Sequence, residues 1–108
     1  MSLRARAVSL RQLPEALNTR QGQALFNDLE TCMNMDRPCI VLDCSKVLQM
    51  DNSILHWLLC CLEEAMKRNG EVKLAGIPSG ARALFGQSGV DRLFEIFETN
   101  EEAVNSFG

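Results

Sequence analysis

Residues 38–43 read Pro-Cys-Ile-Val-Leu-Asp, and this stretch decides the fold class. After Pro38 the apolar residues 39–42 follow one another without interruption, and Asp43 closes the run with a carboxylate. A short apolar run that contains β-branched residues and has a polar end is typical of a strand buried on both faces, as in the centre of a parallel sheet. We therefore expect a strand over residues 39–43 of an α/β sheet.

Helix and strand patterns alternate on both sides of this run. Upstream, residues 5–13 alternate loosely until Pro14, which predicts a strand, and residues 18–34 carry apolar side chains at helical spacing after a capping residue. The elements predicted downstream are a helix from Asp51 to the stop at 67–70, a strand over 71–75, a helix over 78–89, a strand over 93–97 and a last helical turn or two over 100–107. This alternation favours right-handed crossovers with helices on the faces of the sheet.

Length and composition limit the function classes. The chain has 108 residues, 46% of them hydrophobic and 23% charged, with a formal net charge of −3, so we expect one domain over residues 1–108. No window concentrates five or six like charges, which argues against a nucleic-acid partner. Residues 54–62 form the longest nearly apolar stretch, which is too short to cross a bilayer, and the first residues lack a signal-peptide core. We expect a cytoplasmic protein that is not inserted into the membrane.

The cysteines and the single histidine offer no chemistry of their own. Each cysteine lies in or beside an apolar segment, which predicts buried thiols without disulfides: Cys32, Cys39, Cys44, Cys60 and Cys61. There is no Cys-x-x-Cys pair, and no spacing indicates a Ser-His-acid or Cys-His arrangement. The segment 76–80 lacks phosphate-loop and dinucleotide patterns, and we interpret it as a turn with Ser79 as a helix N-cap. We therefore expect no enzyme activity, no metal and no cofactor.

Several further segments follow one another with a recognisable order and spacing. They are Ile40-Val41-Leu42-Asp43-Cys44-Ser45, Met50-Asp51-Asn52-Ser53, Gly70 before a strand, Pro78-Ser79, and Ser88-Gly89-Val90-Asp91-Arg92-Leu93-Phe94. From residue 38 to residue 104 the chain thereby resembles the STAS domain of bacterial anti-sigma factor antagonists. The resemblance implies an α/β STAS-like single domain, with a mixed β-sheet of about four strands and helices packed mainly on one face. That family has two strands before its first helix, where this sequence indicates one clear strand.

The resemblance also implies a function. In that family a Ser or Thr directly after the Asp at the start of the second helix is phosphorylated by a kinase that is also the anti-sigma factor, and the unmodified antagonist binds this kinase and frees the sigma factor. The matching position here is Asn52, whose carboxamide cannot be phosphorylated. Ser53 keeps a hydroxyl one residue later, turned about 100° around the helix. We therefore expect a module that binds an anti-sigma factor or serine kinase, with a degenerate phosphorylation switch that keeps it in the binding state.

The residues expected to bind the partner follow from this interpretation. They are Asp51, Asn52, Ser53, Ile54, His56, Trp57 and Ser79. Phosphorylation of Ser53 and simple N-capping of the helix by residues 51–53 are the alternatives. The helix carries a second apolar stripe formed by Ile54, Trp57 and Cys61, which either packs against a neighbouring helix or faces a partner. The stripe expected to face the sheet consists of Leu55, Leu58, Leu59, Leu62, Ala65 and Met66.

Other functions stay open at this point. The chain could be the STAS-like subunit of a bacterial lipid-transport ATP-binding-cassette complex, in which the same helix start touches an ATPase subunit. It could be a small flavodoxin-like ligand-binding domain with a pocket at the strand ends. A third alternative is a homodimer formed through the sheet edge or the Trp57 stripe. Co-purification with an ATPase, ligand screening and light scattering discriminate among these alternatives.

Overall fold

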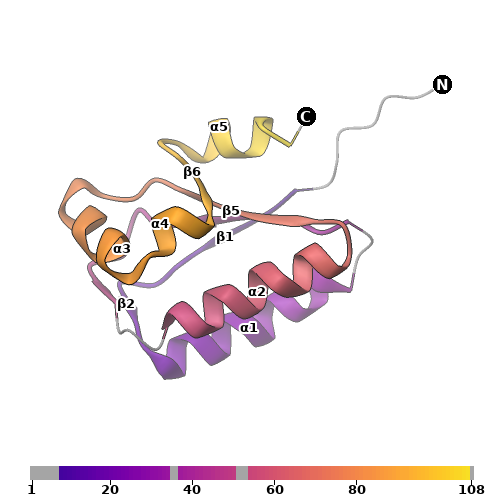
Figure 1. Cartoon of the computed structure of the whole chain (residues 1–108), viewed down its shortest axis with the longest axis horizontal. Helices are drawn as coiled ribbons and strands as arrows, with labels where there is room; N and C mark the ends of the chain where they lie inside the picture. The colour runs from indigo at the N-terminus through magenta and orange to yellow at the C-terminus, as the bar shows by residue number, and fades with distance from the viewer. Residues whose placement is uncertain (1–7, 35–36, 51–53, 108) are drawn as a thin grey trace.

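The structure, a computed structural model, describes residues 8–34, 37–50 and 54–107, in which strands and helices alternate around one main sheet (Figure 1). The elements are β1 (Val8–Gln12), β2 (Ala16–Leu17), α1 (Thr19–Met33), β3 (Cys39–Asp43), β4 (Gln49–Met50), α2 (Ile54–Lys67), β5 (Glu71–Ala75), the 3-10 turn η1 (Ser79–Ala81), α3 (Arg82–Ser88), α4 (Val90–Leu93), β6 (Glu95–Phe97) and α5 (Asn100–Asn105).

The main sheet has four strands in the order β1-β3-β5-β6, and each of its described pairs is parallel. Between each pair of neighbouring strands the chain passes through at least one helix, and such crossovers return it to the same end of the sheet. The predicted α/β STAS-like class is confirmed, although a mixed sheet was expected and the described pairs are uniformly parallel. A second sheet pairs β2 with β4.

The larger core lies on the face of the main sheet that α1 and α2 cover (Figure 1). Alternate residues of β3 and β5 point to this side because successive side chains of a strand face opposite ways. The buried members of this core are Leu13, Leu25, Leu29, Ile40, Leu42, Cys44, Val47, Leu58, Cys61, Ala65, Val72, Leu74, Ile77, Ala81, Phe85, Val90 and Phe94. The expectation that helices pack mainly on one face is thereby confirmed.

Of the described helices, α5 packs on the opposite face, where the buried apolar cluster is small. Val41, Ala75 and Ala103 form this cluster, and Phe97 and Phe107 pack against it. The α5 helix begins after Thr99, whose hydroxyl accepts a hydrogen bond from the backbone amide of Glu102 at 3.1 Å.

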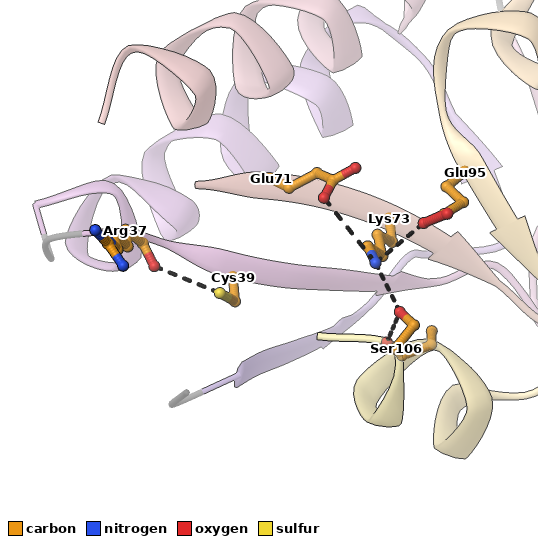
Figure 2. A network of polar contacts seen from close by, with 7 residues as sticks. Arg37, Cys39, Glu71, Lys73, Glu95 and Ser106 are labelled. Atoms are coloured by element: carbon orange, nitrogen blue, oxygen red, sulfur yellow. Dashed lines mark hydrogen bonds and ion pairs between the residues drawn. The ribbon is translucent and has the colours of Figure 1, made fainter. Parts of the chain in front are cut away.

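Lys73 of β5 is buried on the α5 face within a set of directed contacts (Figure 2). Its Nζ lies 3.0 Å from Oε1 of Glu95 and donates a hydrogen bond to Oγ of Ser106 at 2.7 Å. The same ammonium group lies 4.3 Å from the centroid of the Phe107 ring, a distance at which a cation is attracted to the ring face. Lys73 thus connects β5 to β6 and to the turn that follows α5.

The structure corrects several local predictions. The two-residue strand β2 supplies the second strand before α1 that the sequence did not indicate. Residues 90–93 form the separate helix α4, because Gly89 ends α3 in a left-handed conformation with φ of 82°. Pro78 and not Ser79 is the N-cap residue of η1, and the last helix is capped by Thr99.

The packing of α2 differs from the expected stripe. Met66 was expected to face the sheet, but it is 61% exposed, and Cys61 is fully buried in the core instead. Trp57 packs against that core from the side, with its ring centroid 6.0 Å from that of Phe26 on α1. Within the second stripe, the described side chains of Trp57 and Cys61 therefore pack inside the domain.

Candidate functional site

The predicted partner-binding residues Asp51, Asn52 and Ser53 lie outside the described residues. Ile54 is the first residue of α2. In the chain, the β3–β4 loop and the strand β4 come before these residues, and the first turns of α2 follow them. The loop from β5 into η1 starts beside the β3–β4 loop, at Gly76. We call these segments the docking end of the domain.

Asp43 anchors the β3–β4 loop, which is the first segment of the docking end. Its Oδ1 accepts a hydrogen bond from the backbone amide of Ser45 at 2.9 Å. Its Oδ2 accepts hydrogen bonds from the side-chain amides of Asn100 at 3.1 Å and Gln12 at 3.4 Å. Burial alone would raise the pKa of Asp43, but the hydrogen bonds from Ser45, Asn100 and Gln12 stabilise the carboxylate and together lower the pKa. The ionised Asp43 therefore joins β1, α5 and the β3–β4 loop.

Gly76 brings the loop after β5 close to the same anchor. Its φ of 71° lies in the left-handed region, and its backbone amide donates to the carbonyl of Phe97 at 3.0 Å. A Cβ atom at this position would lie 3.4 Å from Oδ1 of Asp43 and 3.6 Å from Cβ of Ser45. The start of the loop that carries Ser79 is thus packed beside the start of the β3–β4 loop.

The small β2–β4 sheet fixes the chain just before residues 51–53. The backbone amides of Leu48 and Gln49 both donate to the carbonyl of Glu15, at 2.8 and 3.0 Å, and Ala16 pairs with Gln49. The side chain of Leu48 is nevertheless 65% exposed, and it lines a small groove with Glu15, Ala16 and Gln49. Sequence analysis missed Leu48, because it directly follows Val47 in a segment of mixed composition, and no periodic pattern there distinguishes the exposed Leu48 from the buried Val47.

The remaining predicted residues differ in their exposure. His56 and Ser79 are exposed, whereas Trp57 is half-buried against α1. The Nε2 atom of His56 lies 3.7 Å from Sγ of Cys60 on the next turn of α2. Apart from residues 51–53 and the side chain of Ile54, which is not described, His56 and Ser79 are the predicted residues with open side chains at the docking end.

The sequence analysis expected buried thiols and no Cys-His arrangement, but Cys60 is half-buried and lies beside His56, because residues four apart share one face of a helix. The other described cysteines are buried. Burial raises the pKa of the Cys44 and Cys61 thiols to about 12, so both stay protonated at neutral pH and are poor nucleophiles. Among the described residues, no group of three or more His, Cys, Asp or Glu side chains is placed to hold a metal ion. The described helices also include none that is long and apolar enough to cross a bilayer.

The sequence profile of the STAS domain matches residues 8–103. The chain belongs to the STAS domain family. The match includes the N-terminal third, in which the sequence alone resembled the family only by its pattern of elements. No curated protein matches the sequence closely enough to be counted as a relative.

Solved structures with the same fold include anti-sigma factor antagonists and STAS domains of sulfate transporters. A putative anti-sigma factor antagonist from Thermotoga maritima is 18% identical, covers 91% of this chain and 86% of that chain, and superimposes with a TM-score of 0.74. The unphosphorylated anti-sigma factor antagonist SpoIIAA is also 18% identical, with coverages of 91% and 87% and a TM-score of 0.73. The STAS domain of a SulP transporter from Vibrio cholerae is 15% identical, with coverages of 98% and 83% and a TM-score of 0.73. At such identities the likeness shows the fold alone.

Proposed function

We propose that this STAS domain is a cytoplasmic protein-interaction module that binds an anti-sigma factor or serine kinase through its docking end. It acts by recognition and not by catalysis. The observation that carries the proposal is the exposed side chain of Leu48 on a backbone segment held by hydrogen bonds from the amides of Leu48 and Gln49 to the carbonyl of Glu15. The anti-sigma factor antagonists among the structures of the same fold support the choice of partner class.

An exposed leucine on a fixed segment is well suited to binding a protein. Burying a leucine side chain contributes about 1.5–3 kcal/mol, and a segment that is already ordered loses little further entropy when it binds. His56 and Ser79 are exposed on the neighbouring segments and supply polar groups for the rim of an interface. The docking end thus combines an apolar anchor with polar surroundings.

Asn52 defines the regulatory part of the proposal. A carboxamide is uncharged and similar in size to the unmodified side chains of the family, so binding is not released by phosphorylation at this position. The domain would then be a permanent binder, controlled by its amount and not by a phosphate. Stoichiometric phosphate on Ser53 after incubation with the partner kinase would contradict this part of the proposal.

Affinity capture with the purified chain tests whether residues 51–53 bind the partner. We expect the wild type to capture a protein of the anti-sigma factor or serine kinase class, identified by mass spectrometry and then purified for titration. Asn52→Asp should weaken its binding at least about tenfold, because the interface would have to desolvate an added charge. Asn52→Ser should bind as the wild type does and become a substrate of the captured kinase. If Asn52→Asp binds the partner as tightly as the wild type does, residues 51–53 are not the docking site.

Two exposed apolar residues of the chain provide a matched pair of variants. Leu48 is 65% exposed at the docking end, and Met66 is 61% exposed near the other end of α2, about 18 Å further along the helix axis from its first residue. Leu48→Asp should weaken binding of the captured partner at least about tenfold, and Met66→Asp should leave it within about twofold. Equal losses in the two variants would show that binding does not depend on the docking end.

A second candidate function is supported by the similarity to the SulP transporter STAS domain, which covers 98% of this chain. In that case the domain would bind a membrane transporter or, as a STAS-like subunit, the ATPase subunit of a lipid-transport complex. The same capture experiment separates the candidates, because a transporter or ATPase would be recovered in place of a kinase.

A further inference from the structure

His56 and Cys60 lie side by side on α2, about one helical turn apart. Residues four apart share one face of a helix, and Nε2 of His56 lies 3.7 Å from Sγ of Cys60. His56 is the single histidine of the chain and is exposed, and Cys60 is the one described cysteine whose side chain is not buried. An imidazole nitrogen and a sulfur atom are therefore held together where solvent reaches them.

The ring of His56 is positioned by its neighbour Trp57. The centroids of the two rings are 5.7 Å apart, and their planes meet at 71°. Trp57 in turn packs against the larger core and against Phe26 of α1. Contacts from surrounding groups orient metal-binding side chains before a metal binds. The imidazole is thus supported by the packed part of the domain, and both donor atoms belong to one regular helix.

The separation of the two donor atoms matches the one that a single metal ion requires. Zinc binds thiolate sulfur at about 2.3 Å and imidazole nitrogen at about 2.0–2.1 Å, and two such bonds at the tetrahedral angle place sulfur and nitrogen about 3.6 Å apart. The observed distance between Sγ and Nε2 is 3.7 Å, so the pair needs almost no movement to hold an ion.

We propose that His56 and Cys60 bind one Zn²⁺ ion through Nε2 and Sγ. On binding, the thiol releases its proton to solvent and the neutral ring keeps its proton on Nδ1, so that each donor atom gives one lone pair to the ion. Thiolate and imidazole are ligands that zinc prefers, whereas Mg²⁺ and Ca²⁺ prefer oxygen. The donor set therefore selects zinc over the common hard cations.

The number of ligands determines how strongly the ion is held. The described residues include no group of three or more metal-binding side chains, so four-coordinate zinc keeps two positions for water or for a ligand from another molecule. Structural sites with four protein ligands have dissociation constants below about 100 nM, and half of the ligands predicts a value on the order of 10 µM. The ion is therefore exchangeable, and its binding does not depend on the proposed docking function.

Calorimetric titration of the full chain with Zn²⁺, in the presence of a phosphine reductant, measures the affinity. The wild type should bind one ion per chain, and His56→Gln and Cys60→Ser should each raise the dissociation constant at least about tenfold. An excess of Mg²⁺ of about 100-fold should not displace the zinc. Thermal unfolding of each variant without metal checks that the fold is kept.

A matched control keeps the composition of the chain and changes only the position of the histidine. His56→Gln combined with Arg82→His moves the imidazole to the exposed start of α3. No His, Cys, Asp or Glu lies three or four positions away from residue 82 in the sequence. This double variant should bind Zn²⁺ as weakly as His56→Gln alone. Wild-type affinity in the double variant would overturn the proposal, because any exposed histidine would then suffice.

Co²⁺ distinguishes metal binding from a simple hydrogen bond between the thiol and the imidazole. A thiolate bound to Co²⁺ gives a charge-transfer absorption in the near ultraviolet, and the hydrogen bond gives none. We expect this absorption in the wild type and its loss in Cys60→Ser. The proposal is overturned if the wild type binds no Zn²⁺ up to about 1 mM, or if either single variant binds Zn²⁺ as the wild type does. In the first case the two groups only share a hydrogen bond, and in the second other side chains bind the ion.

Discussion

On the α1–α2 face of the main sheet, alternate residues of β3 and β5 meet apolar side chains from the helices, whereas on the α5 face the same two strands present Asp43 and Lys73. The first face is held by apolar burial, which has no preferred direction and scales with area. The second face has a small apolar cluster, and its charged groups are satisfied only by partners at defined distances. Stability is therefore concentrated on the α1–α2 face, and contacts on the α5 face set the positions of α5 and of the β3–β4 loop.

The largest expected effect comes from the apolar face. Phe85 is fully buried in the larger core, and Phe85→Ala should lower the free energy of unfolding by about 3–5 kcal/mol because it removes apolar contacts and leaves a cavity. Phe107 is only half-buried on the α5 face, and Phe107→Ala should cost roughly half as much. Urea unfolding of the two variants measures this difference. Equal losses of unfolding free energy would contradict the inference that stability is concentrated on the α1–α2 face.

The next effect separates charge from packing at Lys73. Lys73→Ala should lower the free energy of unfolding by about 2–3 kcal/mol, because it removes both the ion pair with Glu95 and the alkyl contacts in the cluster. Lys73→Met keeps most of the alkyl contacts, and Glu95 is half exposed and regains water. It should therefore be at least about 1 kcal/mol more stable than Lys73→Ala. If the two variants unfold alike, the charge contributes more than the packing.

Acid should weaken the α5 face selectively through Asp43. Because its pKa is lowered in the folded state, ionised Asp43 stabilises the fold fully above the ordinary aspartate pKa of 3.8, and this stabilisation is lost as the pH falls through the lower folded value. Asp43→Asn should cost about 1–2 kcal/mol at neutral pH, and the gap to the wild type should narrow as the pH falls below about 3.8. Urea unfolding across this range measures the gap, and a gap that does not change with pH would contradict the role of the charge.

The smallest expected effect concerns the start of α5. Thr99→Ala removes the N-cap hydrogen bond to the amide of Glu102 and should cost about 1 kcal/mol, whereas Thr99→Ser should be nearly neutral because it keeps the hydroxyl. Chemical denaturation of both variants provides the measurement. A loss in Thr99→Ser equal to that in Thr99→Ala would mean that the methyl group, and not the cap, stabilises this helix.

The parts of the fold that could be predicted from sequence are those with a local pattern. The strands β3 and β5 have the expected bounds, because an apolar run flanked by turn residues is visible in one short window. The two-residue strands β2 and β4 carry no such pattern, since each is defined by a partner more than thirty positions away in the register that joins Ala16 to Gln49. Met66 was wrongly placed because residues 54–62 are apolar on nearly all sides, which leaves the phase of the helix undetermined.

The candidate site also has some features that the sequence predicted and others that it did not. The sequence analysis named His56 and Ser79 as partner-binding residues; both are exposed, and their role in binding stays a prediction. The anchoring role of Asp43 was not visible, because Gln12 and Asn100 are brought to it only by the folded sheet and α5. Likewise, the sequence predicted the start of the last helix at residue 100 but not that the Asn100 side chain donates to Asp43, nor that Thr99 caps the helix.

The helical connections between neighbouring strands of the main sheet also affect how the chain folds. Val8 pairs with Cys39, Cys39 with Glu71 and Lys73 with Glu95, so no two neighbouring strands are joined by a hairpin. Each pairing must close a long loop before it gains any hydrogen bonds, which slows folding relative to helical bundles of similar length. We therefore expect the strands to pair late in folding and in one cooperative step. Because β3 pairs with both β1 and β5, we expect the other elements to depend on it.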